Sequence, residues 1–136
     1  MGIIFDTSTI IAIERGHESL DAFIAGREEE PFGISVVTAA ELLYGVERAD
    51  TEERKLRRQA FVEKVIESFP IFPFDLMIGR IYARIWAAVA QKRWSVGAHD
   101  LIIAATAISL DYTVATVNIR DFEKIPGVKV EKLQSQ

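Results

Sequence analysis

Residues 3–13 read Ile3-Ile4-Phe5-Asp6-Thr7-Ser8-Thr9-Ile10-Ile11-Ala12-Ile13. The first three apolar residues predict a short buried strand, and the acid and hydroxyl residues after them are typical of a helix start. The apolar residues that follow predict the helix itself. Because a strand that leads directly into a helix is the repeating unit of α/β proteins, this stretch predicts an α/β fold.

The strand-to-helix step recurs in the second quarter of the chain. Gly33 to Val37 predicts a strand, and Thr38 opens the expected helix, which reaches about Ala49. Residues 51–69 place apolar side chains at helical spacing among charged ones, which predicts a second helix behind a short turn. These two helices are expected to form a hairpin.

The second half of the chain continues the alternation. The expected elements are an extended segment at 70–74, helices at 75–93 and 100–110, a β-rich segment at 112–117 and an edge strand at 128–133. This order predicts a mainly parallel sheet sandwiched between helices. No repeat or linker divides the chain, so we expect one domain over residues 1–136.

The composition limits the class of protein. With 136 residues, of which 49% are hydrophobic, the chain is long enough for one core. It contains no cysteine, which excludes disulfides and thiolate metal ligands. The apolar opening ends at Asp6, too early for a signal peptide, and no apolar run approaches the roughly 20 residues of a membrane span. We therefore expect a cytoplasmic protein with no membrane association.

The net charge of −4 bears on nucleic-acid binding. It argues against a domain that holds nucleic acid through bulk positive charge, since such domains are usually basic. It does not exclude an enzyme that acts on nucleic acid, because a bound divalent cation reverses the local field where a phosphate would sit.

Four acidic residues stand where an apolar segment stops and a new element is expected to begin. They are Asp6, Glu41, Asp100 and Asp121. The carboxyl ends of parallel strands meet at one edge of a sheet, so these side chains are expected to gather there. Clustered carboxylates repel one another, and burying them unpaired would be costly. The pattern therefore predicts a site for a divalent cation.

Each acid also has a structural explanation. Asp6 can cap the first helix, and Glu41 can close a Thr-x-x-Glu capping box. Asp100 lies in the first turn of a helix, where the helix dipole favours anions, and Asp121 can cap a turn. Taken singly, these explanations are sufficient; the shared sheet edge is what favours one common site.

The donor set indicates the metal and the chemistry. Oxygen ligands without cysteine point to Mg²⁺ or Mn²⁺ rather than zinc. Such an ion can activate water and stabilise the charge that builds on a phosphoryl group. Phosphodiester hydrolysis is therefore the first chemistry to test.

Four segments carry motifs that occur together in one known family. They are Ile4-Phe5-Asp6-Thr7-Ser8, Ser-x-Val-Thr-x-x-Glu-Leu-x-x-Gly at 35–45, His-Asp-Leu-Ile-Ile-Ala-Ala-Thr-Ala at 99–107 and Thr-x-Asn-x-Arg-Asp-Phe at 116–122. Together they resemble a PIN domain, and the VapC toxin group in particular, over nearly the whole chain. The resemblance implies a three-layer α/β/α fold with a mainly parallel central sheet and a protruding helical hairpin.

The resemblance also implies a function. It implies an Mg²⁺-dependent endoribonuclease that is the toxin of a type II toxin–antitoxin pair, with Mn²⁺ able to substitute. The implied partners are an RNA substrate, a VapB-type antitoxin and a second copy of the chain in a homodimer. Carried over by position, Asp6, Glu41 and Asp100 form the core of the metal pocket. The fourth place is open between Asp121 and Asn118, which can bind through its carbonyl or orient a water.

Residues beside these acids have expected supporting roles. Thr7 and Thr116 are candidates to hold carboxylates or water through their hydroxyls, and each can equally be a capping or strand residue. Arg120 is expected to border the pocket. His99 is expected to point away, because adjacent side chains on a helix diverge by about 100°. The resemblance gives Asp75 no metal role, so we interpret it as an N-cap.

The remaining charged and apolar residues predict surfaces. The basic residues Arg54, Lys55, Arg57 and Arg58 predict a solvated helix face with ion pairs to Glu52, Glu53 and Glu63, although some can guide an RNA backbone. Apolar residues left over on the hairpin would suit an antitoxin helix or a homodimer contact. Trp86 is expected in the core.

Two other functions stay open at this point. One is an Mg²⁺-binding phosphotransfer domain of phosphatase or receiver type with Asp6 as nucleophile, although Ser8 stands where the phosphatase pattern has a second aspartate. The other is an interaction module that has lost catalysis, for which Asn118 is the argument.

Overall fold

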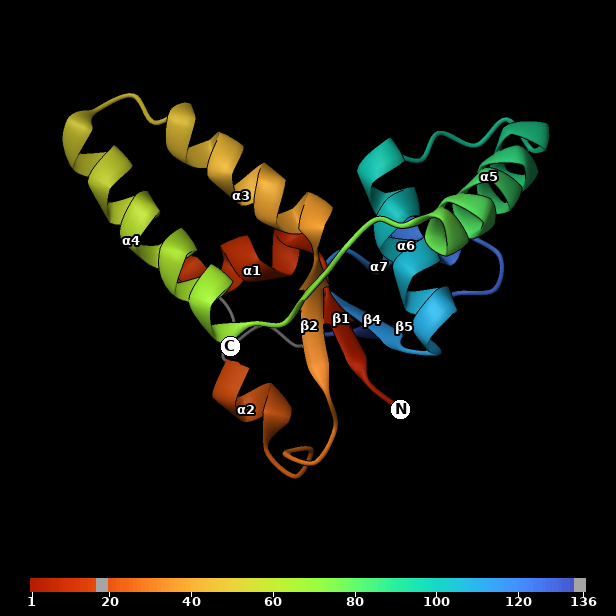
Figure 1. The fold of residues 1–136 in the computed structure, drawn as a ribbon, viewed down its shortest axis with the longest axis horizontal. Coiled ribbons are helices and arrows are strands. Elements are labelled where there is room, and N and C mark those ends of the chain that lie inside the picture. Colours follow the sequence, from red (N-terminus) through yellow and green to blue (C-terminus); the bar gives the residue numbers. More distant parts are fainter. Residues whose placement is uncertain (17–19, 134–136) are drawn as a thin grey trace.

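The structure is a computed structural model, and it describes residues 1–16 and 20–133. The described strands are β1 (Ile3–Phe5), β2 (Phe32–Ser35), β3 (Ile71–Phe72), β4 (Thr113–Thr116) and β5 (Lys129–Lys132). They form one sheet in the order β3-β2-β1-β4-β5, and every neighbouring pair is parallel (Figure 1). The predicted α/β class and parallel sheet are confirmed.

Helices occupy both sides of this sheet. Those described are α1 (Thr7–Glu14), α2 (Leu20–Ile24), α3 (Val36–Glu47), α4 (Glu52–Ser68), α5 (Leu76–Gln91), α6 (Ala98–Leu110) and α7 (Ile119–Glu123). Figure 1 shows the predicted hairpin of α3 and α4 as one arm and α5 with α6 as the other, diverging from the sheet. The first residues of α3 and α6 lie between the arms, next to the ends of β1 and β2 (Figure 1).

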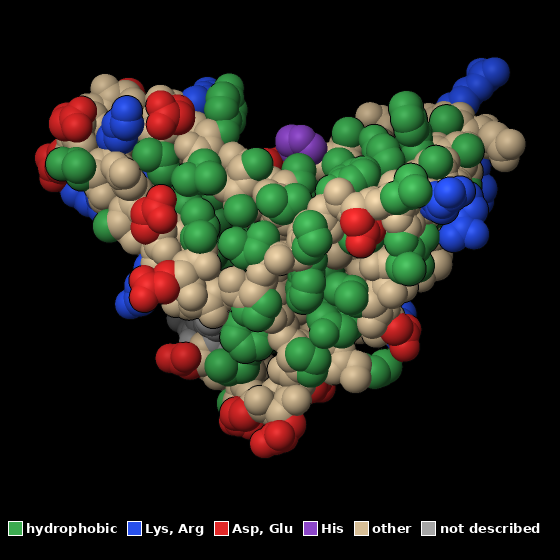
Figure 2. All heavy atoms as spheres, in the orientation of Figure 1, with side chains coloured by type: hydrophobic (Ala, Val, Ile, Leu, Met, Phe, Trp, Pro, Cys, Tyr) green, Lys and Arg blue, Asp and Glu red, His purple; other side chains and the backbone are tan. Residues whose placement is uncertain are grey.

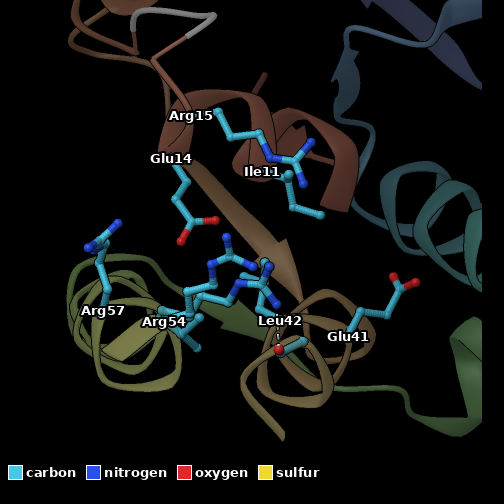
Figure 3. Close-up of a pocket in the computed structure, with 10 residues that line it drawn as sticks. Ile11, Glu14, Arg15, Glu41, Leu42, Arg54 and Arg57 are labelled. Atoms are coloured by element: carbon cyan, nitrogen blue, oxygen red, sulfur yellow. Dashed lines mark hydrogen bonds between the residues drawn. The ribbon is translucent and has the colours of Figure 1, made fainter. Parts of the chain in front are cut away.

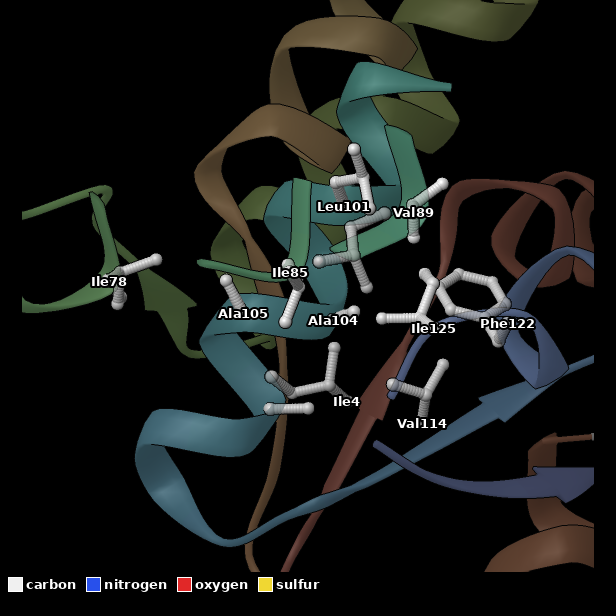
Figure 4. Close-up of a cluster of buried hydrophobic side chains, with 12 residues drawn as sticks. Ile4, Ile78, Ile85, Val89, Leu101, Ala104, Ala105, Val114, Phe122 and Ile125 are labelled. Carbon is white, nitrogen blue, oxygen red and sulfur yellow. The ribbon is translucent and has the colours of Figure 1, made fainter. Parts of the chain in front are cut away.

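The central strand divides the core into two layers. Side chains alternate across a strand, so Ile4 points to one face of the sheet while Ile3 and Phe5 point to the other. Ile4 joins a cluster with residues of α5, α6 and α7 (Figure 4). Ile3 and Phe5 pack against α1, α3 and α4. This arrangement confirms the three-layer α/β/α architecture.

Close strand packing requires a glycine in β2. A Cβ at Gly33 would lie 2.6 Å from both the Phe72 ring and the carbonyl oxygen of Pro70. The short edge strand β3, which the prolines on either side limit, therefore reaches β2 only because residue 33 lacks a side chain.

Several boundaries differ from the predictions. The helix of the second unit begins at Val36, and its N-cap is Ser35, whose hydroxyl accepts the N–H of Val37 at 3.1 Å. The predicted capping box that begins at Thr38 is therefore wrong, and Glu41 lies in the second turn. Asp75 caps α5 as predicted, accepting the N–H of Ile78 at 2.9 Å.

Trp86 is not in the core. It is 55% exposed and stacks on Tyr82, with ring centroids 5.6 Å apart. Only one stripe of α5 is buried, and Trp86 lies about 100° around the helix from Ile85 in that stripe. Among the described residues, no helix combines the length and the apolar character needed to cross a membrane.

Candidate active site

Asp6 connects the end of β1 to the start of α1. It is 3% exposed, and its Oδ1 accepts the backbone N–H and the hydroxyl of Thr9, at 3.2 and 2.5 Å. Its Oδ2 accepts the hydroxyls of Ser8 and Thr116, at 2.7 and 2.9 Å. These four bonds compensate the burial of the carboxylate and fix its direction. Asp6 is thus both a helix cap and an oriented carboxylate.

Glu41 projects from α3 and contacts two other helices. The hydroxyl of Thr7, on α1, donates to Glu41 Oε1 at 2.6 Å. On the other side, His99 Nδ1 of α6 lies 3.1 Å from Glu41 Oε2. The expectation that His99 points away from the pocket is therefore wrong. The Glu41 side chain lies beside the first turn of α6. It therefore contacts His99 and shares a cavity with Asp100.

Asp100 lies half-buried in the first turn of α6. Burial, followed by the charges of Asp121, Asp6 and Glu41, raises the pKa of Asp100 to about 6, while His99 acts in the opposite direction. Three other carboxylates affect the pKa of this carboxyl group only because they lie within electrostatic range. The structure therefore brings together the four acids that the sequence pattern singled out.

The two candidates for the fourth place are bonded to each other. The side-chain amide of Asn118 donates to Asp121 Oδ2 at 2.6 Å, and its backbone N–H donates to the Thr116 hydroxyl at 2.8 Å. Of the charges that act on Asp100, that of Asp121 has the largest effect. This geometry favours Asp121 as the fourth acid and Asn118 as the residue that orients it. Arg120, beside Asp121 on α7, is exposed, and it has no ion pair within the described chain.

The donor set fits Mg²⁺. In the described part of the chain, no three acidic or histidine side chains converge closely enough to enclose a metal ion by themselves. Mg²⁺ does not require such a cage, because it usually keeps several waters and binds one or two carboxylates directly. A structural zinc site would need four protein ligands, which this arrangement does not supply.

Comparisons with known proteins identify the family. The model of the PIN domain matches residues 3–128. The chain belongs to the PIN-domain family. A ribonuclease VapC1 from Rickettsia felis is 38% identical over 139 residues, which cover 100% of this chain and 99% of that protein. A tRNA(fMet)-specific endonuclease VapC from Salmonella typhimurium is 38% identical over 72% of each chain.

Solved structures agree with this membership. A DNA-bound VapBC from Salmonella typhimurium has a TM-score of 0.85 and 30% identity, and the match covers 97% of this chain and 98% of that chain. The protein is thus a PIN-domain ribonuclease of the VapC group, the toxins of VapBC toxin–antitoxin systems. The PIN nuclease family is generally metal-dependent. This membership excludes the phosphotransfer alternative.

Two residues of this PIN domain, Thr9 and His99, contact the site acids although the sequence did not predict these contacts. Thr9 is fully buried and donates to Asp6, while it accepts the N–H of Val117 at 3.1 Å. Its position, three residues after Asp6 at a helix start, was a usable signal, because an N-cap acid faces the third residue after it. His99 gave no such signal, since its contact with Glu41 depends on how α3 crosses α6.

Proposed function

We propose that this protein is an Mg²⁺-dependent endoribonuclease whose cation is held by Asp6, Glu41, Asp100 and Asp121. The observation that carries the proposal is that Asp121, Asp6 and Glu41 lie close enough to the half-buried Asp100 to act on it: burial first, and then their charges, raise the pKa of Asp100 to about 6. Such mutual repulsion destabilises the fold unless a cation offsets it. The raised pKa and the all-oxygen donor set therefore support a functional site in preference to four independent helix caps.

The neighbouring residues have distinct roles in this proposal. Thr9 and Thr116 hold the Asp6 carboxylate, Thr7 holds Glu41, and Asn118 holds Asp121. When bound, Mg²⁺ supplies Lewis-acid polarisation of the phosphoryl group and activation of water, and Mn²⁺ can replace it. Holding each carboxylate in one direction before binding lowers the cost of assembling the site.

The exposed Arg120 has a different expected role. It follows the strand end that carries Thr116, and it precedes Asp121. As a fully charged planar group, its guanidinium suits a phosphate oxygen of the substrate. Since the proposed substrate is RNA, we place the protein in the cytoplasm.

A VapB-type antitoxin is the proposed protein partner. An apolar hollow of about 220 Å³ lies between α1 and α4, and Ile10, Ile13, Phe61, Val65 and Phe69 line it. A helix of the partner would bury apolar side chains there. The Salmonella relative is described as a VapBC complex, which supports the same assignment.

A second copy of the chain is the other proposed partner. Large apolar side chains are exposed on α5, among them Leu76, Met77 and Trp86. Figure 2 shows many hydrophobic side chains on this face of the molecule. A monomer rarely exposes so many neighbouring apolar groups, which supports a homodimer contact through this face.

The direct test is incubation of the purified protein with total cellular RNA, with and without Mg²⁺, followed by mapping of the new ends. We expect discrete cuts that require Mg²⁺ or Mn²⁺ and that stop when EDTA is added. Transfer RNAs belong among the substrates, because the Salmonella relative is named as a tRNA(fMet)-specific endonuclease. Intact RNA at every metal concentration would contradict the proposal and favour an inactive interaction module.

A further inference from the structure

A groove between α1, α3 and α4 has four arginines among its ten lining residues. It has a volume of about 360 Å³, and its charged lining consists of Arg15, Arg54, Arg57, Arg58, Glu14 and Glu41. Figure 3 shows Arg15 lying along α1 beside Ile11, on the side of the groove opposite Arg54 and Arg57 of α4, and Glu14 pointing toward those two arginines. Four arginines thus face two glutamates in a chain whose net charge is −4. We call this cavity the arginine groove.

Two of the arginines have acidic partners. Arg54 pairs with Asp50 and Arg57 with Glu53, both at 2.9 Å and one helical turn apart. The predicted ion pairing of this helix face is correct for Glu53, while Lys55 pairs with Glu47 at 3.9 Å. Exposed pairs of this kind are weak and screened by salt, so they can rearrange when a stronger anion arrives.

The other two arginines form no ion pair within the described chain, although the charge of Arg58 acts on Asp50. Arg58 donates to the carbonyl oxygen of Gly45 at 3.0 Å, which links α4 to α3 and leaves most of its five N–H donors free. Arg15 is exposed beyond the end of α1 and forms no ion pair with a described residue. The negative end of the α1 dipole favours a cation at this position, and the Arg15 side chain lines the groove.

The arginine groove and the carboxylate pocket are neighbours that share one lining residue. Glu41 lines the arginine groove, and it also lines a second cavity, of about 310 Å³, with His99 and Asp100. A polymer whose reacting phosphate lies at the four acids would reach the arginine groove by passing Glu41.

We propose that the arginine groove binds the phosphodiester backbone of RNA beside the cleavage site, with Arg15 and Arg58 contacting phosphates directly. The planar guanidinium matches two phosphate oxygens, which is the chemistry that a repeating backbone offers. An acidic peptide is the rival occupant. It is disfavoured because the apolar hollow between α1 and α4, with Lys64 as its one charged lining residue, already offers the surface that a protein helix needs. The inference rests on the proposed ribonuclease function.

The test separates binding from cleavage. A labelled single-stranded RNA oligomer is titrated in EDTA, over a range of salt concentrations, with wild type, Arg15→Gln, Arg58→Gln and the control Arg84→Gln. Arg84 is exposed on α5, in the other arm of the molecule. Each groove substitution should lower the salt slope by about 0.7 and weaken binding about fivefold at about 0.1 M salt, the effect of one lost phosphate contact. Arg84→Gln should leave both quantities unchanged.

Further variants keep the outcomes distinct. Arg15→Lys should recover part of the affinity. The Arg15 side chain forms no ion pair with the residues that the structure describes, so its variants remain informative even if Arg58→Gln loosens the hairpin. RNA binding unchanged in both groove variants would overturn the inference, while Mg²⁺-dependent cleavage by wild type would leave the proposed function intact. The same variants are also titrated with a polyglutamate peptide. If they lost binding to the peptide but bound RNA as wild type does, the inference would also be overturned. Lack of cleavage by wild type would instead contradict the proposed function.

Discussion

The side-chain amide of Asn118 lies 2.6 Å from Asp121 Oδ2, so the two residues that compete for the fourth place in the pocket form a single unit. Asp121 supplies the charge, as its effect on the pKa of Asp100 indicates, and Asn118 limits the directions in which that charge can point. The family resemblance allows an acid at position 118 or at position 121. Because these two side chains are in contact, an acid at either position would lie in the same part of the pocket.

This relationship predicts unequal effects of two substitutions. Asp121→Asn should lower kcat/KM for RNA cleavage by about 100-fold or more, whereas Asn118→Ala should lower it by about tenfold, the usual effect of losing an orienting partner. Cleavage kinetics with one defined RNA, at equal concentrations of folded protein, measure both. If Asn118→Ala proved the more damaging change, Asn118 would be the ligand and Asp121 its support.

The bonds around Asp6 predict a difference in stability. Thr9→Val removes a buried donor to Asp6 and leaves the N–H of Val117 without an acceptor, which should cost about 2 kcal/mol of unfolding free energy. Ser8→Ala is the matched control. It removes another hydroxyl from Asp6, but Ser8 is only partly buried, so water can replace the bond and the cost should stay below about 1 kcal/mol. Urea unfolding measures both, and equal losses would contradict the account.

The raised pKa of Asp100 predicts a pH dependence. A carboxyl whose pKa is 3.8 in the unfolded chain and about 6 in the folded one destabilises the fold progressively as pH rises through that interval. In EDTA, Asp100→Asn should therefore match wild type in melting temperature near pH 4 and exceed it at pH 7. The expected gain is a few degrees, which corresponds to about 1 kcal/mol after allowance for the half-exposed position.

Thermal melts of the two proteins at several pH values provide the measurement. Addition of Mg²⁺ at pH 7 should reverse the order, since the cation offsets the repulsion in wild type alone. Parallel pH profiles for wild type and Asp100→Asn would show that neither burial nor the other acids raise the pKa of this carboxyl.

The local elements of the fold were predictable because each depends on a short stretch of sequence. Apolar runs located the strands, and helical spacing located α4 and α5. The five-residue helices α2 and α7 were missed, because a helix barely longer than one turn has no measurable periodicity. The start of α3 was misplaced by two residues, since Ser35 and Thr38 are both good caps and only the geometry of β2 selects Ser35.

The site was predictable in part for the same reason. Asp6, Asp100 and Asp121 lie at or in the first turn of a helix, and Glu41 lies one turn further into α3. A parallel sheet brings such helix starts to one edge whatever the details of packing. The contact between His99 and Glu41 depends instead on the crossing of two helices. The exposure of Trp86 depends on how many sides of α5 are covered. Neither the contact of His99 nor the exposure of Trp86 can be predicted from one segment, because both depend on how separate segments pack together.

The most direct test of the central claim is the RNA cleavage rate of Asp100→Asn against that of Asp75→Asn. Asp100 lies in the first turn of α6, and Asp75 is the exposed N-cap of α5. Asparagine is an equally good cap, so Asp75→Asn should preserve the helix start. We predict that Asp100→Asn loses at least about 100-fold in Mg²⁺-dependent cleavage and weakens Mn²⁺ binding, while Asp75→Asn retains the wild-type values. Cleavage at the wild-type rate by a folded Asp100→Asn protein would contradict the account.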